Sequence, residues 1–473
     1  MKKTIHDKKL PHLRQALNGE LMANAFEALF RRDYPERELQ VQHCRVGRVY
    51  HKPGKDCGIM YRVSCRDREQ RVHENWFYGK MFANGKVHST SGKKHPATWP
   101  GCGFWKPVSL WRETEMILHA FPYDSYLPHL GRLLEPEFIK QQVEENLSGF
   151  GLPDGSRCLE VACEKIKYMP NKRCVLRYEL RVRDPQGRER QLVFYSKTYD
   201  NAKSRYVFEV LRELCRHPKC NHGALNIPHP IAHIDEANTL WQHAWAGEDF
   251  RAAVKRCGWE NLASSGYLSA MAAMLATLHQ IELRQARLQA GPTFEMVLEN
   301  ARSDVFDLSG FLPEQAGALQ RILNKLARTA ATFTEPLPRV TMHGTFKLAQ
   351  LLCREQQDHN PERQLPCRSG QLALIDFDSI ACGDPLYDVA ELVASLAYLH
   401  VSEDLALNIA RHNVESFLQL YESQVPWPCE RARHSWYVVT FLLGKMHSSL
   451  KRLEKKTEEL APAFELLYSW LDG

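Results

Sequence analysis

Hydrophobic residues recur at helical spacing near the start of the chain. Between Leu10 and Arg32 the apolar positions follow a period close to that of an α-helix, and they are Leu13, Leu17, Leu21, Phe26, Leu29 and Phe30. Such spacing places apolar side chains on one helical face. The segment therefore predicts an amphipathic helix or a pair of them. β-branched and aromatic residues with short turns follow, which predicts strands.

The second half of the chain is dominated by helical periodicity. Apolar spacing predicts helices over residues 269–281, 313–332, 405–421 and 431–453. Upstream, residues 225–250 are typical of two short strands followed by a Gly-containing exit into a helix. Residues 119–147 predict a Pro-punctuated connector that ends in a helix.

An internal repeat organises the strand-rich part. Residues 53–86 align with residues 170–203 at a constant offset of 117, without a gap, and twelve of these 34 positions are identical. Both copies contain a turn with Pro and Lys, an outgoing strand, a polar hairpin and a returning strand that ends in Lys. This pattern predicts a duplicated β-hairpin unit, and hence two small sheet domains in tandem. The alternative is a similarity of composition between two basic hairpins.

The overall composition constrains the function only loosely. The chain has 473 residues, with 62 Lys and Arg against 56 Asp and Glu, a net charge of +6. This mild excess suits an anionic ligand such as a nucleotide, and does not favour nucleic-acid binding. The fourteen cysteines are scattered, no signal peptide is evident, and no stretch of 18 apolar residues occurs. We expect a soluble cytoplasmic protein with reduced thiols and no membrane contact.

The chemistry concentrates in two segments. Residues 340–352 read VTMHGTFKLAQLL, and residues 372–392 read LALIDFDSIACGDPLYDVAEL. This pair resembles phosphotransferases of the aminoglycoside phosphotransferase and choline kinase type, which are relatives of the protein kinases. Those enzymes carry His-Gly-Asp, an Asn five residues later, and a strand that ends in Asp-Phe or Asp-Trp. Here His343 and Gly344 are followed by Thr345, and Gln350 takes the place of Asn.

The resemblance implies ATP and Mg²⁺ as cofactors. Asp376, after the apolar strand 372–375, matches the metal-binding Asp, and Gln350 matches the second metal ligand. Phosphoryl transfer needs charge neutralisation by Mg²⁺, a hard cation that prefers oxygen ligands. An amide oxygen serves as well from Gln as from Asn. The metal site is therefore expected to be intact.

Thr345 is the departure from the pattern. A threonine hydroxyl cannot accept a proton near neutral pH, so a general-base contribution of roughly 10²-fold to 10⁴-fold is forfeited unless another group replaces it. The candidates are Asp378 as a base and Lys347 as an electrostatic stabiliser. His343 is expected to orient the loop. Two further carboxylates, Asp384 and Asp388, are expected to be structural.

The resemblance also implies a phosphate-contacting lobe upstream. Lys197, at the end of the returning strand of the second repeat, matches the lysine that reaches the nucleotide phosphates, and Glu213 is its expected partner. Lys172 and Arg173 lie in the loop expected to cover the phosphates, which lacks the glycines of protein kinases. Residues 240–245 are the expected adenine-facing backbone. The alternative for Lys197 is a solvated charge at a strand end.

The resemblance implies an α+β, two-lobed protein-kinase-like fold, with a small antiparallel sheet and a larger helical lobe, and the repeat places an extra N-terminal α+β domain before it. We expect an accessory domain over residues 1–115, a connector over 116–150, the small lobe over 151–245 and the helical lobe over 246–473. The resemblance covers about residues 155–450. The first repeat has no His-Gly segment of its own.

Two functions follow. The first is an ATP-dependent phosphotransferase that acts on a hydroxyl of a small metabolite, such as a sugar or an aminoglycoside-like compound. The second is a nucleotide-binding pseudokinase that acts as a scaffold and contacts a protein partner through the N-terminal domain. Lys197, Gln350 and Asp376 favour the first function, and Thr345 favours the second.

Two further clusters are expected to be structural. Cys215, His217, Cys220 and His222 have metal-capable side chains, but their spacing is unlike that of zinc sites with paired CxxC motifs, so reduced thiols and surface imidazoles are expected. Residues 445–456 form a basic helix face that is expected to be solvated.

Overall fold

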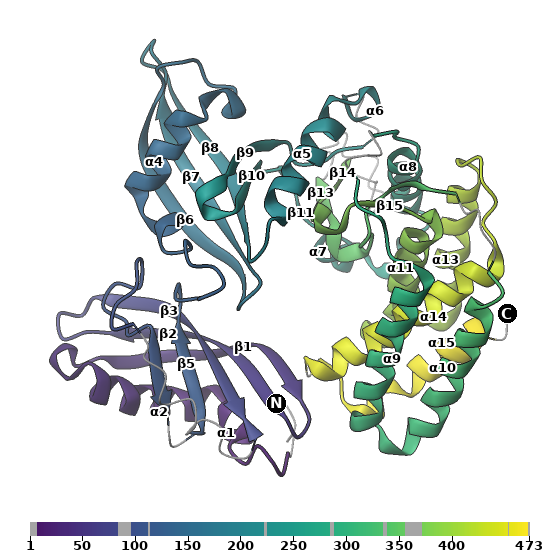
Figure 1. Cartoon of the computed structure of the whole chain (residues 1–473), viewed down its shortest axis with the longest axis horizontal. Coiled ribbons are helices and arrows are strands. Elements are labelled where there is room, and N and C mark those ends of the chain that lie inside the picture. The colour runs from purple at the N-terminus through teal and green to yellow at the C-terminus, as the bar shows by residue number, and fades with distance from the viewer. Residues whose placement is uncertain are drawn as a thin grey trace. The chain divides into compact units, whose positions relative to one another are not determined.

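The computed structural model describes residues 7–83, 96–111, 114–221, 225–283, 288–333, 338–354, 371–452 and 454–471. The chain divides into two compact units. One comprises Met1–Ala202, Ile234–Thr239 and Lys451–Glu454, and the other comprises Lys203–His233, Leu240–Leu450 and Lys455–Gly473. Figure 1 labels the elements of both units.

The first sheet has five antiparallel strands in the order β1-β2-β3-β5-β4. The strands are β1 (Gln40–Lys52), β2 (Asp56–Arg66), β3 (Val72–Phe82), β4 (Val108–Trp111) and β5 (Met116–Ala120). Two helices precede them, α1 (Leu13–Ala16) and α2 (Gly19–Asp33), as the periodicity predicted. Asn18 caps α2 by accepting the backbone N–H groups of Glu20 and Leu21.

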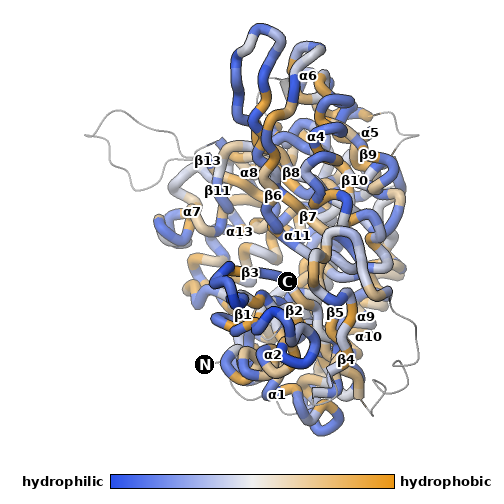
Figure 2. The backbone as a smooth tube through the Cα atoms, turned by 90° about the vertical axis from the view of Figure 1, so that its left-hand side faces the viewer, coloured by the Kyte–Doolittle hydropathy of each residue, from blue (hydrophilic) through white to orange (hydrophobic). Residues whose placement is uncertain are grey.

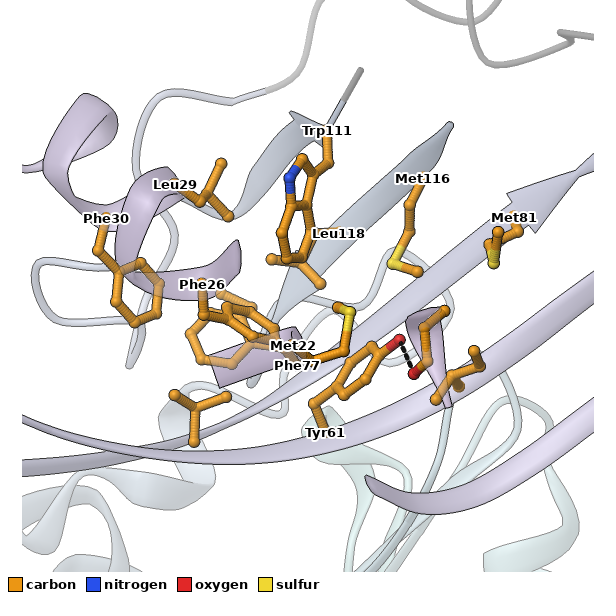
Figure 3. Close-up of a cluster of buried hydrophobic side chains, with 14 of the residues drawn as sticks. Met22, Phe26, Leu29, Phe30, Tyr61, Phe77, Met81, Trp111, Met116 and Leu118 are labelled. Carbon is orange, nitrogen blue, oxygen red and sulfur yellow. Dashed lines mark hydrogen bonds between the residues drawn. The ribbon is translucent and has the colours of Figure 1, made fainter. Parts of the chain in front are cut away.

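The core of this first domain is aromatic. The buried face of α2 packs against side chains from the sheet, including Tyr61, Phe77 and Trp111 (Figure 3). Phe26 lies at its centre, with its ring centroid 5.0 Å from that of Trp111 and 5.4 Å from that of Tyr61. Tilted and edge-on ring pairs of this kind add to the stabilisation that burial of apolar area provides.

The second sheet repeats the first. Its strands are β6 (Arg157–Met169), β7 (Arg173–Arg183), β8 (Glu189–Tyr199), β9 (Pro230–Ile234) and β10 (Thr239–His243), in the order β6-β7-β8-β10-β9. Two helices belong to this part of the sequence, α4 (Pro136–Glu145) before β6 and α5 (Lys203–Arg216) after β8. Each of β6, β7 and β8 begins and ends 117 positions after its counterpart in the first sheet. The duplication is therefore structural and does not reflect composition alone.

Buried hydrogen bonds repeat with the same offset. The hydroxyl of Tyr61 donates to the carbonyl of Ala16 at 2.9 Å, and the hydroxyl of Tyr178 donates to the carbonyl of Leu133 at 2.7 Å. Both the donors and the acceptors are 117 positions apart. Each bond ties the middle strand of a hairpin unit to the segment that precedes its helix.

The duplication also extends upstream of the aligned hairpins, into residues predicted to be a connector. Asp7 accepts the backbone N–H of Gly54 at 2.8 Å, and Asp124 accepts that of Asn171 at 2.7 Å, again with the 117-residue offset. Residues 116–120 form β5 of the first sheet, which pairs with β3. The segment 116–150, expected to be a connector that ends in a helix, therefore contains the last strand of the first sheet, the beginning of the second repeat and helix α4.

The second unit contains mainly helices. They include α7 (Phe250–Cys257), α8 (Tyr267–His279), α9 (Phe294–Phe311), α10 (Ala316–Ala330), α11 (Pro385–Ala397), α12 (Leu399–Ser402), α13 (Leu407–Glu422), α14 (Arg431–Lys451) and α15 (Ala461–Leu471). The predictions at 269–281, 313–332, 405–421 and 431–453 correspond to α8, α10, α13 and α14. The α+β class and the succession of an antiparallel sheet and a larger helical region are thus confirmed.

Short strands frame the loops of interest in this unit. They are β12 (Val340–Met342), which pairs with β15 (Ala381–Gly383), and β13 (Leu351–Arg354), which pairs with both β14 (Gln371–Leu374) and β11 (Glu248–Asp249). Figure 2 shows hydrophobic and hydrophilic positions interspersed along the chain. Within the described residues, no helix combines the length and apolar character needed to cross a membrane.

Candidate active site

The loop after β12 has a backbone conformation that requires glycine. Gly344 has φ +77°, in the left-handed region that side chains disfavour. A Cβ atom at this position would lie 2.2 Å from the carbonyl oxygen of Ser379, far inside van der Waals contact. The loop therefore packs directly against the 3₁₀ turn Phe377–Ser379, which brings the two sequence motifs together.

Asp388 anchors this loop from the first turn of α11. Its carboxylate accepts the backbone N–H of His343 at 2.6 Å and that of Gly344 at 2.8 Å. The same carboxylate lies 3.3 Å from Nε2 of His279 on α8, and Nδ1 of His279 lies 2.7 Å from the hydroxyl of Tyr421 on α13. All of these groups are buried. The contacts agree with the prediction that Asp388 is structural.

His343 bridges the two motifs through its ring. Its Nε2 lies 3.1 Å from the carbonyl oxygen of Ile375, which can only accept, so Nε2 carries the proton. Nδ1 is then the acceptor for the hydroxyl of Thr345, 3.3 Å away. Burial lowers the pKa of His343 and favours the neutral ring. The geometry supports an orienting role for His343.

The two predicted metal ligands lie side by side. Asp376 follows β14 with φ +70°, and Nε2 of Gln350 donates to its Oδ2 at 3.1 Å. The backbone holds the pair as well, since Ile375 donates its N–H to the carbonyl of Gln350 at 2.9 Å. Asp376 is half-buried, so its carboxylate remains partly accessible. The sequence motifs therefore converge on one carboxylate and one amide.

A charged cluster lies beside the loop. Nζ of Lys347 is 3.6 Å from Oε1 of Glu391, a buried carboxylate on α11. Nζ of Lys445, from α14, donates to the hydroxyl of Ser395 at 2.9 Å. Burial raises the pKa of Glu391 and lowers that of Lys445 to about 8. The sequence analysis missed Glu391, although a Glu within the apolar run of α11, three positions after Asp388, was a usable signal. It expected Lys445 on a solvated helix face, whereas Lys445 contacts Ser395.

The other predicted carboxylates have distinct surroundings. Asp378 is buried within the 3₁₀ turn 377–379, and its role as a replacement base stays a prediction. Asp384 caps α11 by accepting the N–H of Leu386 at 3.0 Å, and its Oδ2 lies 3.0 Å from Nε of Arg433. Asp384 is thus a helix-start carboxylate, in agreement with the sequence.

Comparison with protein families identifies the chain. The model of the phosphotransferase enzyme family matches residues 177–422, which cover more than half of the sequence and include both motifs. The chain belongs to this family. No curated protein matches the chain.

Several solved phosphotransferase structures resemble the chain at low identity. An aminoglycoside phosphotransferase from Streptomyces rimosus is 16% identical, with 58% of this chain and 90% of that chain covered and a TM-score of 0.34. A choline kinase from Cryptosporidium parvum is 14% identical, with 71% and 94% covered and a TM-score of 0.44. A choline kinase from Streptococcus pneumoniae is 14% identical, with 71% and 99% covered and a TM-score of 0.37.

The predicted nucleotide-contacting residues of this family member lie on the second repeat and on the helix after it. Lys197 lies on β8, opposite Val175 of β7, and Lys172 and Arg173 occupy the end of the β6–β7 turn. The turn is tight, because Lys172 donates its N–H to the carbonyl of Met169 at 3.1 Å. Glu213 lies on α5. Their roles toward a nucleotide stay predictions.

The cysteine and histidine cluster shows no metal-binding geometry in the described part of the chain. No three His, Cys, Asp or Glu side chains gather there to hold a metal ion. Burial raises the pKa of Cys215 to about 12 and that of Cys220 to about 11, so both thiols stay protonated. His222, the last member of the predicted cluster, lies outside the described residues.

Proposed function

We propose that the protein is an ATP-dependent phosphotransferase that transfers the γ-phosphoryl group to a hydroxyl of a small molecule, such as a sugar or an aminoglycoside-like compound. The observation that carries this proposal is the contact between Gln350 and Asp376, on loops that Asp388 and Gly344 hold together. Membership of the phosphotransferase family supports the reaction class. The acceptor itself is proposed only as a class.

The residues present fit a magnesium ion. Asp376 offers a partly exposed carboxylate, and Gln350 offers an amide within hydrogen-bond distance of it. Mg²⁺ is commonly held by one or two protein oxygens together with substrate phosphates and water. The amide nitrogen of Gln350 faces Asp376 here, so metal binding requires the amide to turn and present Oε1. Bound magnesium would neutralise charge on the β- and γ-phosphates.

The chain's own groups then account for positioning. We assign Lys197 to the phosphates, with Glu213 as its partner and Lys172 and Arg173 over them. The acceptor oxygen attacks the γ-phosphorus, the bond from that phosphorus to the β–γ bridging oxygen breaks, and ADP leaves with both electrons. Lys347 is placed by Glu391 to stabilise the transferring group.

The acceptor proton needs a separate route. Thr345 cannot take it as a base, and its hydroxyl already donates to His343. Because the transition state of phosphoryl transfer is loose, the proton leaves late and the missing base slows the reaction rather than blocking it. Asp378 is the proposed acceptor of that proton, and bulk water completes the transfer.

The test is magnesium-dependent ATP consumption across a panel of hydroxylated metabolites, measured for wild type, Asp376→Ala and Lys197→Ala. We expect turnover in wild type and its loss in both variants. The internal repeat supplies a matched control, because Lys80 is the counterpart of Lys197 in the first repeat. Lys80→Ala should retain wild-type turnover. Equal losses in Lys80→Ala and Lys197→Ala would contradict the assignment of Lys197.

Calorimetric titration with Mg-ATP separates this function from the pseudokinase alternative. Binding that depends on Asp376, without turnover for any acceptor, is the result that the pseudokinase function predicts. The absence of magnesium-dependent ATP binding would contradict both functions. Wild-type turnover that Asp376→Ala abolishes establishes the enzyme.

A further inference from the structure

A small groove lies between the two repeats within the first compact unit. Strands β1, β2 and β3 of the first repeat form one wall, and the end of β6 forms the other. Its volume is about 160 Å³. Pockets for drug-sized ligands are roughly 300–1,000 Å³, so this groove suits a single group of about phosphate size rather than a nucleoside.

The charged side chains that line this groove are cationic. Arg48, Arg62 and Lys167 contribute to the lining, and none of the described lining residues is acidic. The described carboxylate that approaches Arg62 is that of Glu74, with Oε1 4.0 Å from Nε, and both side chains are about half exposed. An exposed ion pair at this distance neutralises little of the guanidinium charge.

A partly buried ammonium lies near the groove. Lys165, which also belongs to β6, has its Nζ 5.8 Å from the ring centroid of Trp76, a groove residue. The guanidinium carbon of Arg62 lies 4.7 Å from the same ring. Lys165 donates to the side-chain oxygen of Asn75 at 3.5 Å, and burial lowers its pKa. The carboxylate of Glu74, which also approaches Arg62, opposes this lowering, so one carboxylate is shared by two cations on this side of the groove.

The surrounding domain has the same imbalance. Residues 1–123 contain 22 Lys and Arg against 12 Asp and Glu, whereas the whole chain has 62 against 56. The net positive charge of the protein therefore originates in the first repeat. Such a field raises the local concentration of anions around the groove.

We propose that this groove binds the phosphoryl group of a small anionic ligand, with Arg48, Arg62 and Lys167 donating to its oxygens. Trp76 is 8% exposed and has cations near its ring, so its face is not open to stack a base. The ligand is therefore an inorganic phosphate, a diphosphate or a small phosphate ester. This site shares no residue with the proposed catalytic loops, and the proposal does not depend on their function.

The test is calorimetric titration of the full-length protein with diphosphate, in phosphate-free buffer at constant ionic strength and without magnesium. Glycerol phosphate is titrated in parallel to distinguish an ester from inorganic phosphate. Arg48→Glu and Arg62→Gln should each weaken binding about tenfold or more, since each removes a charge-assisted hydrogen bond. Arg14→Glu, an exposed arginine on α1, makes the same charge change as Arg48→Glu and should leave the affinity within about twofold.

Three results would overturn the proposal. The first is no binding of either probe to wild type. The second is that Arg14→Glu weakens binding as much as Arg48→Glu does, which indicates diffuse attraction of anions to the whole domain. The third is binding that Lys197→Ala abolishes and Arg48→Glu does not, which places the anion at the predicted nucleotide site.

Discussion

Asp388 accepts the backbone N–H of His343 at 2.6 Å, across 45 positions of sequence. A second backbone N–H, that of Gly344, reaches the other carboxylate oxygen, and His279 approaches from α8. The buried carboxylate thus fixes the path of the loop that presents Thr345. Loop position and fold stability are therefore coupled through one side chain.

Asp388→Asn should destabilise the fold by about 3 kcal/mol or more. The amide keeps one acceptor oxygen, but its NH₂ group then faces a backbone N–H donor, so one hydrogen bond is lost. A charge-assisted hydrogen bond of this kind contributes about 1.5–3 kcal/mol. Urea denaturation followed by circular dichroism measures the loss. Asp404→Asn is the matched control, because the Asp404 side chain is 92% exposed. A loss no larger than that of the control would contradict the anchoring role.

His434 should make the fold sensitive to acid. Burial lowers the pKa of His434 from 6.5 to about 3, so between these values the unfolded state binds a proton that the folded state does not. Stability contributed by the neutral ring is complete above pH 6.5 and falls by about 1.4 kcal/mol for each pH unit below it.

The comparison for His434 is His434→Phe, which keeps a ring beside Trp470. Both side chains are uncharged at pH 7.5, so the difference in unfolding free energy there reports packing alone. Between pH 7.5 and 4.5 wild type should lose about 3 kcal/mol more than His434→Phe. Urea titrations at the two pH values give the numbers, and parallel losses in both proteins would refute the prediction.

Tyr61→Phe and Tyr178→Phe should have similar effects on stability. Each removes a buried hydroxyl and leaves a carbonyl, that of Ala16 or Leu133, without its hydrogen bond, at a cost of about 1–3 kcal/mol. Tyr126→Phe, at an exposed tyrosine, should change the unfolding free energy by less than about 0.5 kcal/mol. A loss confined to one of the two buried positions would show that the two bonds are not equivalent in energy.

The repeat was predictable from the sequence only in the part where chemically specific residues recur at a constant offset. Pro53 with Pro170 and Lys80 with Lys197 gave the offset, and the strands follow it. The upstream half escaped detection because burial requires only apolar character there, so Ala16 and Leu133 occupy equivalent places without being identical. The matching Asp7 and Asp124 were the available signal.

The site was predictable where the family resemblance supplied the spacing of the motif residues. His343, Gln350 and Asp376 converge as the motifs indicated, and Asp384 and Asp388 are structural carboxylates. The pairing of Lys347 with Glu391 was not predictable, although Glu391 stands out within an apolar run, because it lies on a helix 44 positions away. Helical periodicity marks a buried face, but it does not reveal which polar residue on that face meets a distant loop.

Lys347→Met should lower kcat by about tenfold to a hundredfold and change the KM for ATP little. The ammonium lies 3.6 Å from Glu391, which fixes its position, and a preorganised cation acts mainly on charge that develops in the transition state. Lys255→Met, an exposed lysine on α7, is the control. Steady-state kinetics with an acceptor from the metabolite panel provide both constants. A rise in the KM for ATP with unchanged kcat would instead indicate a ground-state contact.

Thr345→Asp should raise kcat, by up to roughly 10²-fold if proton removal limits the reaction, because a carboxylate accepts the proton that the hydroxyl cannot. In wild type the hydroxyl donates to Nδ1 of His343, and burial disfavours the charged ring, so this pair is a poor base. Thr345→Val removes the hydroxyl with little change of shape and should keep wild-type kcat. The pH dependence of kcat gives the decisive measurement, since only Thr345→Asp should acquire a decline toward acid from protonation of the new carboxylate. A rate that Asp leaves unchanged and Val abolishes would mean that the Thr345 hydroxyl itself takes part in the transfer.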